Sequence, residues 1–134
     1  MGKPKQPIIN RWKQNGVVIT QDDISLDIQG FVYVITNTTN HHRYIGRKHT
    51  WTGKDTKAKP VKPSNWQRYW GSNKELQADI KRLGVDKFTR EILSFHKTKR
   101  ETNYAETKEL FARDVLNDLT YYNANIMGKF FRKS

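Results

Sequence analysis

Tyr33 and Tyr44 are the residues whose type and spacing first suggest chemistry. They lie eleven residues apart, in two segments rich in β-branched and aromatic residues, 30–37 and 43–47. The polar residues between these segments can turn the chain, so the sequence predicts an antiparallel hairpin with one tyrosine on each strand. The alternative is that both are ordinary strand tyrosines whose rings belong to the core.

A phenol takes part in proton transfer only with help from its surroundings. Its ordinary pKa of about 10 makes it a poor base at neutral pH unless neighbouring cations lower that pKa. Four side chains close to Tyr44 in sequence could supply positive charge: Arg43, Arg47, Lys48 and His49. We therefore expect these cations to activate the tyrosine hydroxyls.

The whole chain is strongly basic. It has 134 residues and a formal net charge of +12, from 25 Lys and Arg against 13 Asp and Glu. The length predicts one domain, and the charge predicts a polyanionic partner, most commonly nucleic acid. A solvated basic surface, as in ribosomal or architectural proteins, would explain the charge equally well.

Several classes of protein are disfavoured. The chain has no cysteine, which excludes disulfides and thiolate metal sites. Its four histidines lack the paired spacing of a zinc site. No apolar run reaches the length of a membrane span, and the first residues lack the apolar segment of a secretory signal. We therefore expect a cytoplasmic protein that does not contact membranes.

Positive charge is concentrated between residues 43 and 68, where eight basic residues accompany one acidic residue. Part of this region, 49–64, holds Gly53, Pro60 and Pro63, and we expect it to form a basic loop without regular structure. Such a loop could grip a phosphate backbone. The candidate DNA-binding residues are Arg43, Lys48, Lys54, Lys57, Lys59, Lys62 and Arg68.

The remaining elements follow from local patterns. Residues 1–16 predict a polar arm tethered by Trp12, and residues 17–29 a short β-excursion with Ile24, Leu26 and Ile28 on one face. Capping boxes at 72–75 and 98–101 predict two helices, the first ending at Gly84, and residues 87–95 predict a third strand between them. In the second helix, four apolar residues define the expected buried side: Tyr104, Phe111, Val115 and Leu119. The order predicts an α+β fold, a small antiparallel sheet of about three core strands flanked by helices.

The hairpin carries a resemblance to a known family. Val32-Tyr33 followed by Tyr44-Ile45-Gly46 resembles the two half-motifs of the GIY-YIG endonucleases, with Phe31 where the first motif glycine would stand and Gly30 one step earlier. Further matches, to the phage-encoded Seg-type branch (SegE-like), lie in 69–76, Leu83-Gly84, Phe88 and 91–93. The resemblance covers residues 30–126, which we expect to form the nuclease domain, preceded by an arm and β-excursion (1–29) and followed by a basic tail (127–134).

The resemblance implies roles for individual residues. The Tyr33 hydroxyl would orient or deprotonate the attacking water, and that of Tyr44 would contact the phosphate. One helical glutamate would hold a single Mg²⁺ or Mn²⁺ ion. Helical periodicity slightly favours Glu109, whereas the match to the phage branch favours Glu106, which we adopt with Glu109 as the alternative.

The family's catalytic arginine has no direct counterpart, because Lys54 stands at its usual place. We expect Arg47 to contact the phosphate, with Arg68 as the alternative at the helix position. Asn123 and Gly46 match supporting positions of the family. His49 lies five residues after Tyr44 and could be a second proton carrier or phosphate contact.

These inferences predict a metal-dependent DNA endonuclease, phage-encoded and acting in the cytoplasm of a bacterial cell. Its specificity should be loose, because homing endonucleases of this family append a separate DNA-reading module and this chain has only the arm, the 49–64 loop and the tail. The alternative is a non-catalytic nucleic-acid-binding protein on a degenerate GIY-YIG scaffold. An RNA-binding protein would explain the charge but not the tyrosine hairpin. The oligomeric state is left open.

Overall fold

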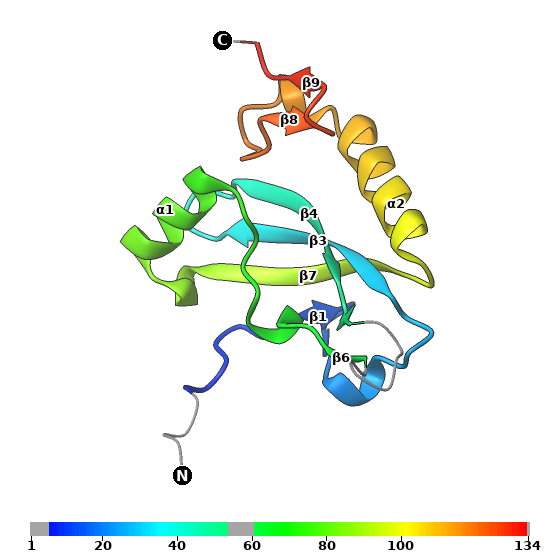
Figure 1. Cartoon of the computed structure of the whole chain (residues 1–134). Helices are drawn as coiled ribbons and strands as arrows, with labels where there is room; N and C mark the ends of the chain where they lie inside the picture. Colours follow the sequence, from blue (N-terminus) through cyan, green and yellow to red (C-terminus); the bar gives the residue numbers. More distant parts are fainter. Residues whose placement is uncertain (1–5, 54–60, 134) are drawn as a thin grey trace.

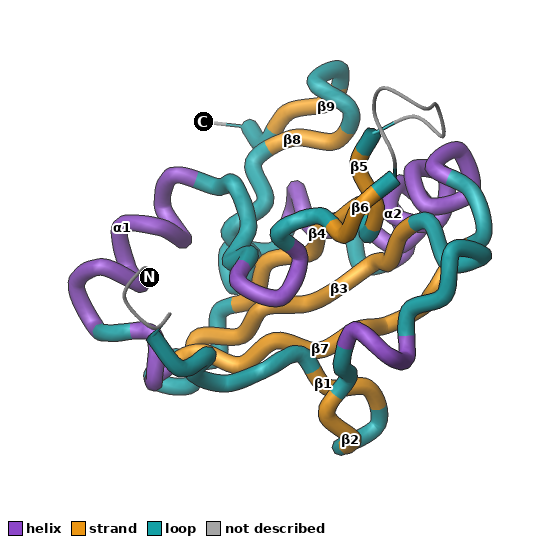
Figure 2. Tube along the Cα trace, turned by 60° about the horizontal axis from the view of Figure 1, so that its bottom comes forward, coloured by secondary structure: helices purple, strands orange, loops and turns teal. Residues whose placement is uncertain are grey.

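The computed structural model describes residues 6–53 and 61–133. Its centre is a five-stranded sheet in the order β2-β1-β7-β3-β4 (Figures 1 and 2). The strands are β1 (Lys13–Gln14), β2 (Val17–Val18), β3 (Gly30–Asn37), β4 (Arg43–His49) and β7 (Phe88–His96). Two helices pack on the sheet, α1 (Lys74–Leu83) and α2 (Lys99–Ala112). The α+β prediction is confirmed.

Strand β3 is buried on both faces, and this divides the core in two. Phe31, Tyr33 and Ile35 alternate with Val32 and Val34 along the strand. The first set packs in a cluster with side chains from the arm, the residues before α1, α1 and β7: Trp12, Trp66, Leu76 and Phe88 among others. The second set packs in a cluster with α2 and the residues after it: Leu110, Val115, Tyr121 and Ile126 among others. A strand buried in this way carries a continuous apolar run, as residues 31–35 do.

The predicted hairpin and third strand are confirmed. Strands β3 and β4 pair antiparallel with Tyr33 opposite Gly46 and Ile35 opposite Tyr44. Strand β7 pairs antiparallel with the other edge of β3. The three predicted core strands are therefore antiparallel, and β1 extends the sheet by pairing parallel to β7, with Lys13 opposite Glu91.

The residues before the hairpin contribute to the same core. Trp12 is 1% exposed and donates a hydrogen bond from Nε1 to the Trp66 carbonyl at 2.7 Å, so the predicted tether is confirmed. The predicted common face of Ile24, Leu26 and Ile28 is wrong. A 3₁₀ turn, η1 (Gln21–Asp23), and a second turn at residues 26–27 replace an extended strand here, and Leu26 is exposed while Ile24 is buried.

The helix starts follow side-chain caps. Thr98 caps α2 by accepting a hydrogen bond from the Glu101 amide, as predicted. Helix α1 begins one residue later than its predicted box, because the Asn73 side chain accepts from the Leu76 amide at 3.0 Å and fills the cap position expected of Ser72. Gly84, at φ +95°, ends α1 as predicted.

The predicted buried side of α2 is wrong. Tyr104, Phe111 and Leu119 are exposed, and the helix ends at Ala112, before Val115. The side facing the sheet instead carries Thr102 and Leu110. Thr102 lies so close to Gly30 that a Cβ atom on Gly30 would come within 2.9 Å of the Thr102 Cγ2. Because Gly30 has no side chain, α2 can pack closely on the sheet through Thr102, although the helix has no large apolar stripe.

The basic loop contains a short regular element, contrary to expectation. Strand β5 (Trp51–Thr52) pairs antiparallel with β6 (Lys62–Pro63) at the two ends of the loop. Lys62 therefore lies on a strand, whereas Lys54, Lys57 and Lys59 lie outside the described residues. No helix within the described ranges is both long and apolar enough to cross a membrane.

The C-terminal residues form a hairpin instead of a free tail. Strand β8 (Asn125–Ile126) pairs antiparallel with β9 (Phe130–Phe131). Arg132 donates through Nη2 to three carbonyls in the preceding residues, those of Val115, Tyr121 and Asn123, at 2.7–2.9 Å. This basic residue therefore anchors the hairpin.

One buried cation joins the arm to the rest of the fold. Arg90 of β7 is 2% exposed and lies between the rings of Trp12 and Trp70, with its Cζ atom 4.8 and 4.1 Å from the ring centroids. Its guanidinium donates to the carbonyls of Asn10, Gln67 and Tyr69. Burial lowers the pKa of Arg90 to about 9, so it remains charged at neutral pH.

Replacing Arg90 should destabilise the fold severely. We expect Arg90→Met to lower the free energy of unfolding by about 3 kcal/mol, because three partly buried carbonyls lose their charged donor. The exposed Arg100→Met should change it by less than about 0.5 kcal/mol. Urea unfolding of the two variants beside the parent measures both values, and equal stability of the variants would contradict a structural role for Arg90.

Candidate active site

Tyr33 and Tyr44 lie on the same face of the hairpin, as diagonal neighbours with ring centroids 6.2 Å apart. Gly46 makes this arrangement possible. A Cβ atom on Gly46 would come within 2.6 Å of the Tyr33 Cζ and 3.0 Å of the Tyr44 Cε2. Its lack of a side chain lets the Tyr33 ring lie across β4, which gives the predicted supporting position a steric reason.

Burial, and not neighbouring charge, dominates the two phenols. The pKa of Tyr33 is raised well above its ordinary value, first by burial and then by Tyr44 and Tyr69. Burial also raises the pKa of Tyr44, although a hydrogen bond with Ser72 and the Arg47 charge act in the opposite direction. The prediction that cations lower these pKa values is therefore wrong, and both tyrosines are neutral hydrogen-bonding groups at neutral pH.

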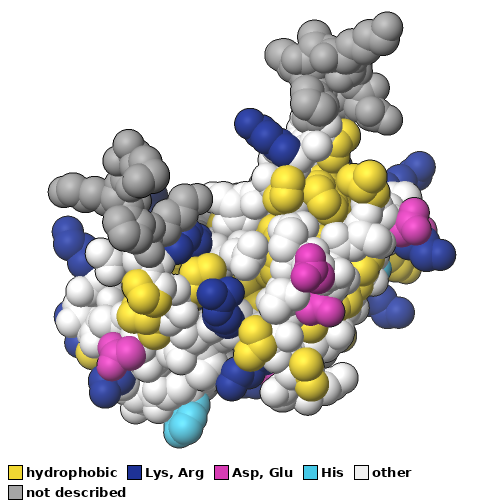
Figure 3. All heavy atoms as spheres, turned by 90° about the horizontal axis from the view of Figure 1, so that it is seen from below, with side chains coloured by type: hydrophobic (Ala, Val, Ile, Leu, Met, Phe, Trp, Pro, Cys, Tyr) yellow, Lys and Arg dark blue, Asp and Glu magenta, His cyan; other side chains and the backbone are white. Residues whose placement is uncertain are grey.

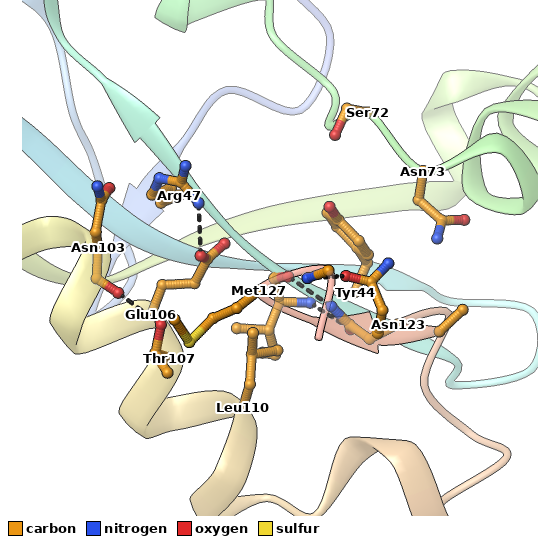
Figure 4. A pocket seen from close by; sticks show the side chains of 14 residues that line it. Tyr44, Arg47, Ser72, Asn73, Asn103, Glu106, Thr107, Leu110, Asn123 and Met127 are labelled. Carbon is orange, nitrogen blue, oxygen red and sulfur yellow. Dashed lines mark hydrogen bonds and ion pairs between the residues drawn. The ribbon is translucent and has the colours of Figure 1, made fainter. Parts of the chain in front are cut away.

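Arg47 and Glu106 form an ion pair on the other face of the hairpin. The Arg47 Nη1 donates to the Glu106 Oε1 at 2.7 Å (Figure 4). The Glu106 side chain is 15% exposed, and it shares the sheet-facing side of α2 with Thr102 and Leu110. Glu109 is more exposed and instead binds Arg113 at 2.6 Å. Glu106, the glutamate preferred from the sequence, therefore has its carboxylate beside Arg47, the predicted phosphate contact.

The side chains of the two faces meet because β4 is the edge strand of the sheet. A hollow of about 290 Å³ extends around this edge. Its lining residues are Tyr33, Tyr44, Arg47, Lys48, His49, Tyr69, Ser72 and Glu106. A larger cleft of about 680 Å³ shares Tyr44, Arg47, Ser72 and Glu106 and continues between α2 and the β8–β9 turn (Figure 4).

The pKa values of two groups in this hollow are shifted by burial. Burial raises the pKa of Glu106, and the charge and hydrogen bond of Arg47 only partly oppose that rise. The pKa of His49 is lowered, first by burial and then by the charges of Lys99 and Arg47. The His49 Nε2 is buried and has no hydrogen-bond partner among the described residues. A neutral imidazole with a free ring nitrogen can accept a proton.

Arg68, the alternative arginine, is not part of the hollow. It closes the 3₁₀ turn η2 (Trp66–Arg68), in which Trp66 points into the core, and it donates to the carbonyl of Gln6 in the arm. It therefore lies in a separate small hollow with residues of the arm. The geometry favours Arg47 for the arginine role.

The other candidate DNA-binding residues are distributed around the molecule. Lys48 places its Nζ 4.3 Å from the centre of the Tyr69 ring in the hollow, while Arg43 stacks on Tyr121. On the face drawn in Figure 3, Lys and Arg side chains are spread out and not gathered in one patch. This distribution suits sequence-independent attraction to a polyanion more than recognition of a defined sequence.

Asn123 supports β4 in the way its predicted role requires. Its Oδ1 accepts from the Ile45 amide at 3.0 Å and its Nδ2 donates to the Ile45 carbonyl at 2.8 Å. The lining residues missed from the sequence include Tyr69, Ser72 and Asn103. Tyr69 and Ser72 belong to the segment that carried the family resemblance, so a signal for them was present. For Asn103 the only signal in the sequence was its position one helical turn before Glu106.

The residues present fit a single hard cation. Among the described residues there is no group of three or more His, Asp or Glu side chains that could hold a metal. Glu106 nevertheless supplies one poorly hydrated carboxylate in a cleft lined mainly by polar residues. Mg²⁺ suits such a site because it keeps several waters and commonly takes only one or two protein carboxylates.

Comparison with known proteins identifies relatives. Residues 12–126 match the model of the family described as "Putative endonuclease segE, GIY-YIG domain". A protein of Enterobacteria phage T4 with the same name is 33% identical over 93 residues, which is 69% of this chain. The chain covers only 39% of the length of that relative. No solved structure gives a significant match.

The ion pair makes a testable prediction about Glu106. Arg47→Met removes the main group that favours the charged carboxylate, so the pKa of Glu106 should rise further above its ordinary value. Arg113→Met, which disrupts the Glu109 pair instead, is the matched control and should leave Glu106 unchanged. Carbon-13 NMR of the glutamate carboxyls across a pH titration measures both. An unchanged Glu106 pKa in Arg47→Met would mean that the pair does not persist in solution.

Proposed function

Because this chain belongs to the SegE-like family of GIY-YIG endonucleases, we propose that it hydrolyses phosphodiester bonds of DNA in a metal-dependent reaction. The observation that carries the proposal is the meeting of Tyr44, Arg47 and Glu106 in one cleft around the edge of β4. The cleft thus combines a hydroxyl donor, a guanidinium and a carboxylate. Phosphodiester hydrolysis requires groups of these kinds, which stabilise charge on the phosphate and hold a metal ion.

Arg47 and Glu106 neutralise each other when no substrate is bound. A phosphate entering the cleft offers Arg47 a stronger partner, because guanidinium and phosphate form paired, charge-assisted hydrogen bonds. Glu106 is then free to hold Mg²⁺ or Mn²⁺, which would supply Lewis-acid stabilisation of the phosphate charge. Tyr44, neutral at working pH, would donate its hydroxyl hydrogen to a phosphate oxygen.

Activation of the attacking water is divided between two side chains. Tyr33 is too deeply buried to ionise, so its hydroxyl would orient the water without removing a proton. His49 lines the same hollow, and an imidazole that is neutral at neutral pH is a better proton acceptor than a buried phenol. We therefore infer that His49 is the general base and that Tyr33 orients the water.

The degenerate first half-motif does not favour the non-catalytic alternative. Phe31, at the place of the motif glycine, is fully buried and packs edge-on against Trp12 and Trp66. The extra ring is thus accommodated in the core, and Tyr33 still reaches the hollow. A loosely specific enzyme acting in the bacterial cytoplasm during phage infection fits the basic surface and the T4 relative.

Glutamate substitutions test the proposed chemistry. On supercoiled plasmid with Mg²⁺, Glu106→Gln should lower the cleavage rate about 100-fold or more, because the carboxylate that holds the ion is lost. Glu109→Gln should cut at nearly the parental rate, since Glu109 lies outside the cleft. The reverse order of activities would move the metal ligand to Glu109. Equal rates for both variants and the parent would remove a helical carboxylate from the mechanism.

Removing single hydroxyls separates chemistry from packing. Tyr44→Phe should lower turnover roughly tenfold to hundredfold, the value of a hydrogen bond to a charged group, while the melting temperature stays close to that of the parent. Tyr33→Phe should also lower turnover, through loss of the oriented water. Tyr104→Phe, at an exposed position on α2, is the control and should be neutral. A variant at either site that melts earlier but keeps full turnover would identify a packing residue.

A further inference from the structure

The turn between β8 and β9 places an exposed apolar side chain at the active-site cleft. Met127 and Gly128 form the turn, and both line the cleft that contains Arg47 and Glu106. The Met127 side chain points across this cleft toward α2 (Figure 4), and the residue is 60% exposed. The neighbouring lining is mostly polar, so the cleft offers a thioether few apolar partners.

Methionine is also an unfavourable residue for this backbone. Met127 has φ +60° and Gly128 has φ +66°, so both lie in the left-handed region, and the Lys129 amide donates to the Ile126 carbonyl across them. Asn tolerates this conformation, whereas Met is strained in it. An exposed apolar side chain in a strained conformation suggests a use outside folding.

The hairpin that carries Met127 is rigidly held. Ile126 is 2% exposed, and the Phe130 ring packs on Phe111 of α2 with centroids 5.5 Å apart. Arg132 adds its three hydrogen bonds at the base of the hairpin. The turn is therefore fixed beside the cleft and does not need to move to reach a molecule bound there.

We propose that Met127 is a wedge that inserts between base pairs of duplex DNA beside the scissile phosphate. This inference rests on the proposed function, which places DNA in the cleft. Methionine is among the apolar residues that proteins insert between base steps, where the side chain unstacks the bases and kinks the duplex. Arg47 within the cleft and Lys129 next to the turn could hold phosphates near the unstacked step.

The turn itself provides a favourable test variant. Met127→Asn removes the apolar wedge and installs a residue that tolerates the left-handed conformation, so folding should be preserved. Met127→Leu retains an apolar side chain, and Leu119→Asn removes an exposed apolar residue outside the cleft. On supercoiled plasmid, Met127→Asn should cleave about tenfold more slowly than the parent, a modest part of the free energy of unstacking one base step.

Permanganate oxidation of thymines detects unstacking directly and needs no knowledge of the DNA target. In the inactive Glu106→Gln background, bound linear DNA should show hyperreactive thymines. The hyperreactivity should be lost with Met127→Asn and retained with Met127→Leu and Leu119→Asn. An unchanged thymine pattern with Met127→Asn, or no hyperreactivity at all, would overturn the wedge.

The wedge and the nuclease proposal can fail separately. If the parent cuts plasmid but thymine reactivity does not depend on Met127, the nuclease stands and the wedge is wrong. If the parent does not cut but its DNA shows hyperreactive thymines that require Met127, the wedge stands and the nuclease proposal is wrong.

Discussion

The outer edge of β4 is held by Asn123, whose side-chain amide both donates to and accepts from the backbone of Ile45. Just before it, Arg43 exchanges backbone hydrogen bonds with Thr120 and Tyr122, so the segment between α2 and β8 pairs with an otherwise open strand edge. This pairing positions the start of β4 and leaves Arg47 and His49 to line the hollow. The site depends on β4 being an edge strand. Tyr33 and Tyr44 lie on one face of the sheet and Arg47 on the other, and a further full strand beyond β4 would separate them.

Desolvation sets the electrostatic character of this site. The charge of Arg47 favours the ionised forms of both Glu106 and Tyr44, yet burial raises both pKa values. The attraction of Arg47 therefore offsets only part of the desolvation of Glu106. In the proposed reaction, a phosphate at Arg47 and a cation at Glu106 would replace this ion pair.

Local signals in the sequence predicted the parts of the fold that local interactions decide. The hairpin, the Thr98 cap and the end of α1 at Gly84 each follow from a few neighbouring residues. The buried side of α2 could not be predicted in this way, because it depends on the close approach of Thr102 to Gly30, far away in the chain. The tyrosine pKa values depend first on burial in the assembled core, which neighbouring sequence does not reveal, so counting nearby cations gave the wrong sign. Arg68 was a candidate for the catalytic arginine because of its position in the sequence. In the structure Trp66 of the same turn is buried, and Arg68 contacts the arm instead.

The partners of Arg90 also constrain how the chain can acquire its structure. The arm meets this cation across 80 residues of sequence, and β1 finds its parallel neighbour only in β7. During synthesis from the N-terminus, β1 can pair with β2, but Trp12 and the β7-facing edge of β1 lack their partners until most of the sheet has emerged. Contacts of such long separation slow folding and expose apolar surface while they form. The polar and basic composition of residues 1–16 would keep this segment soluble until β7 has been synthesised.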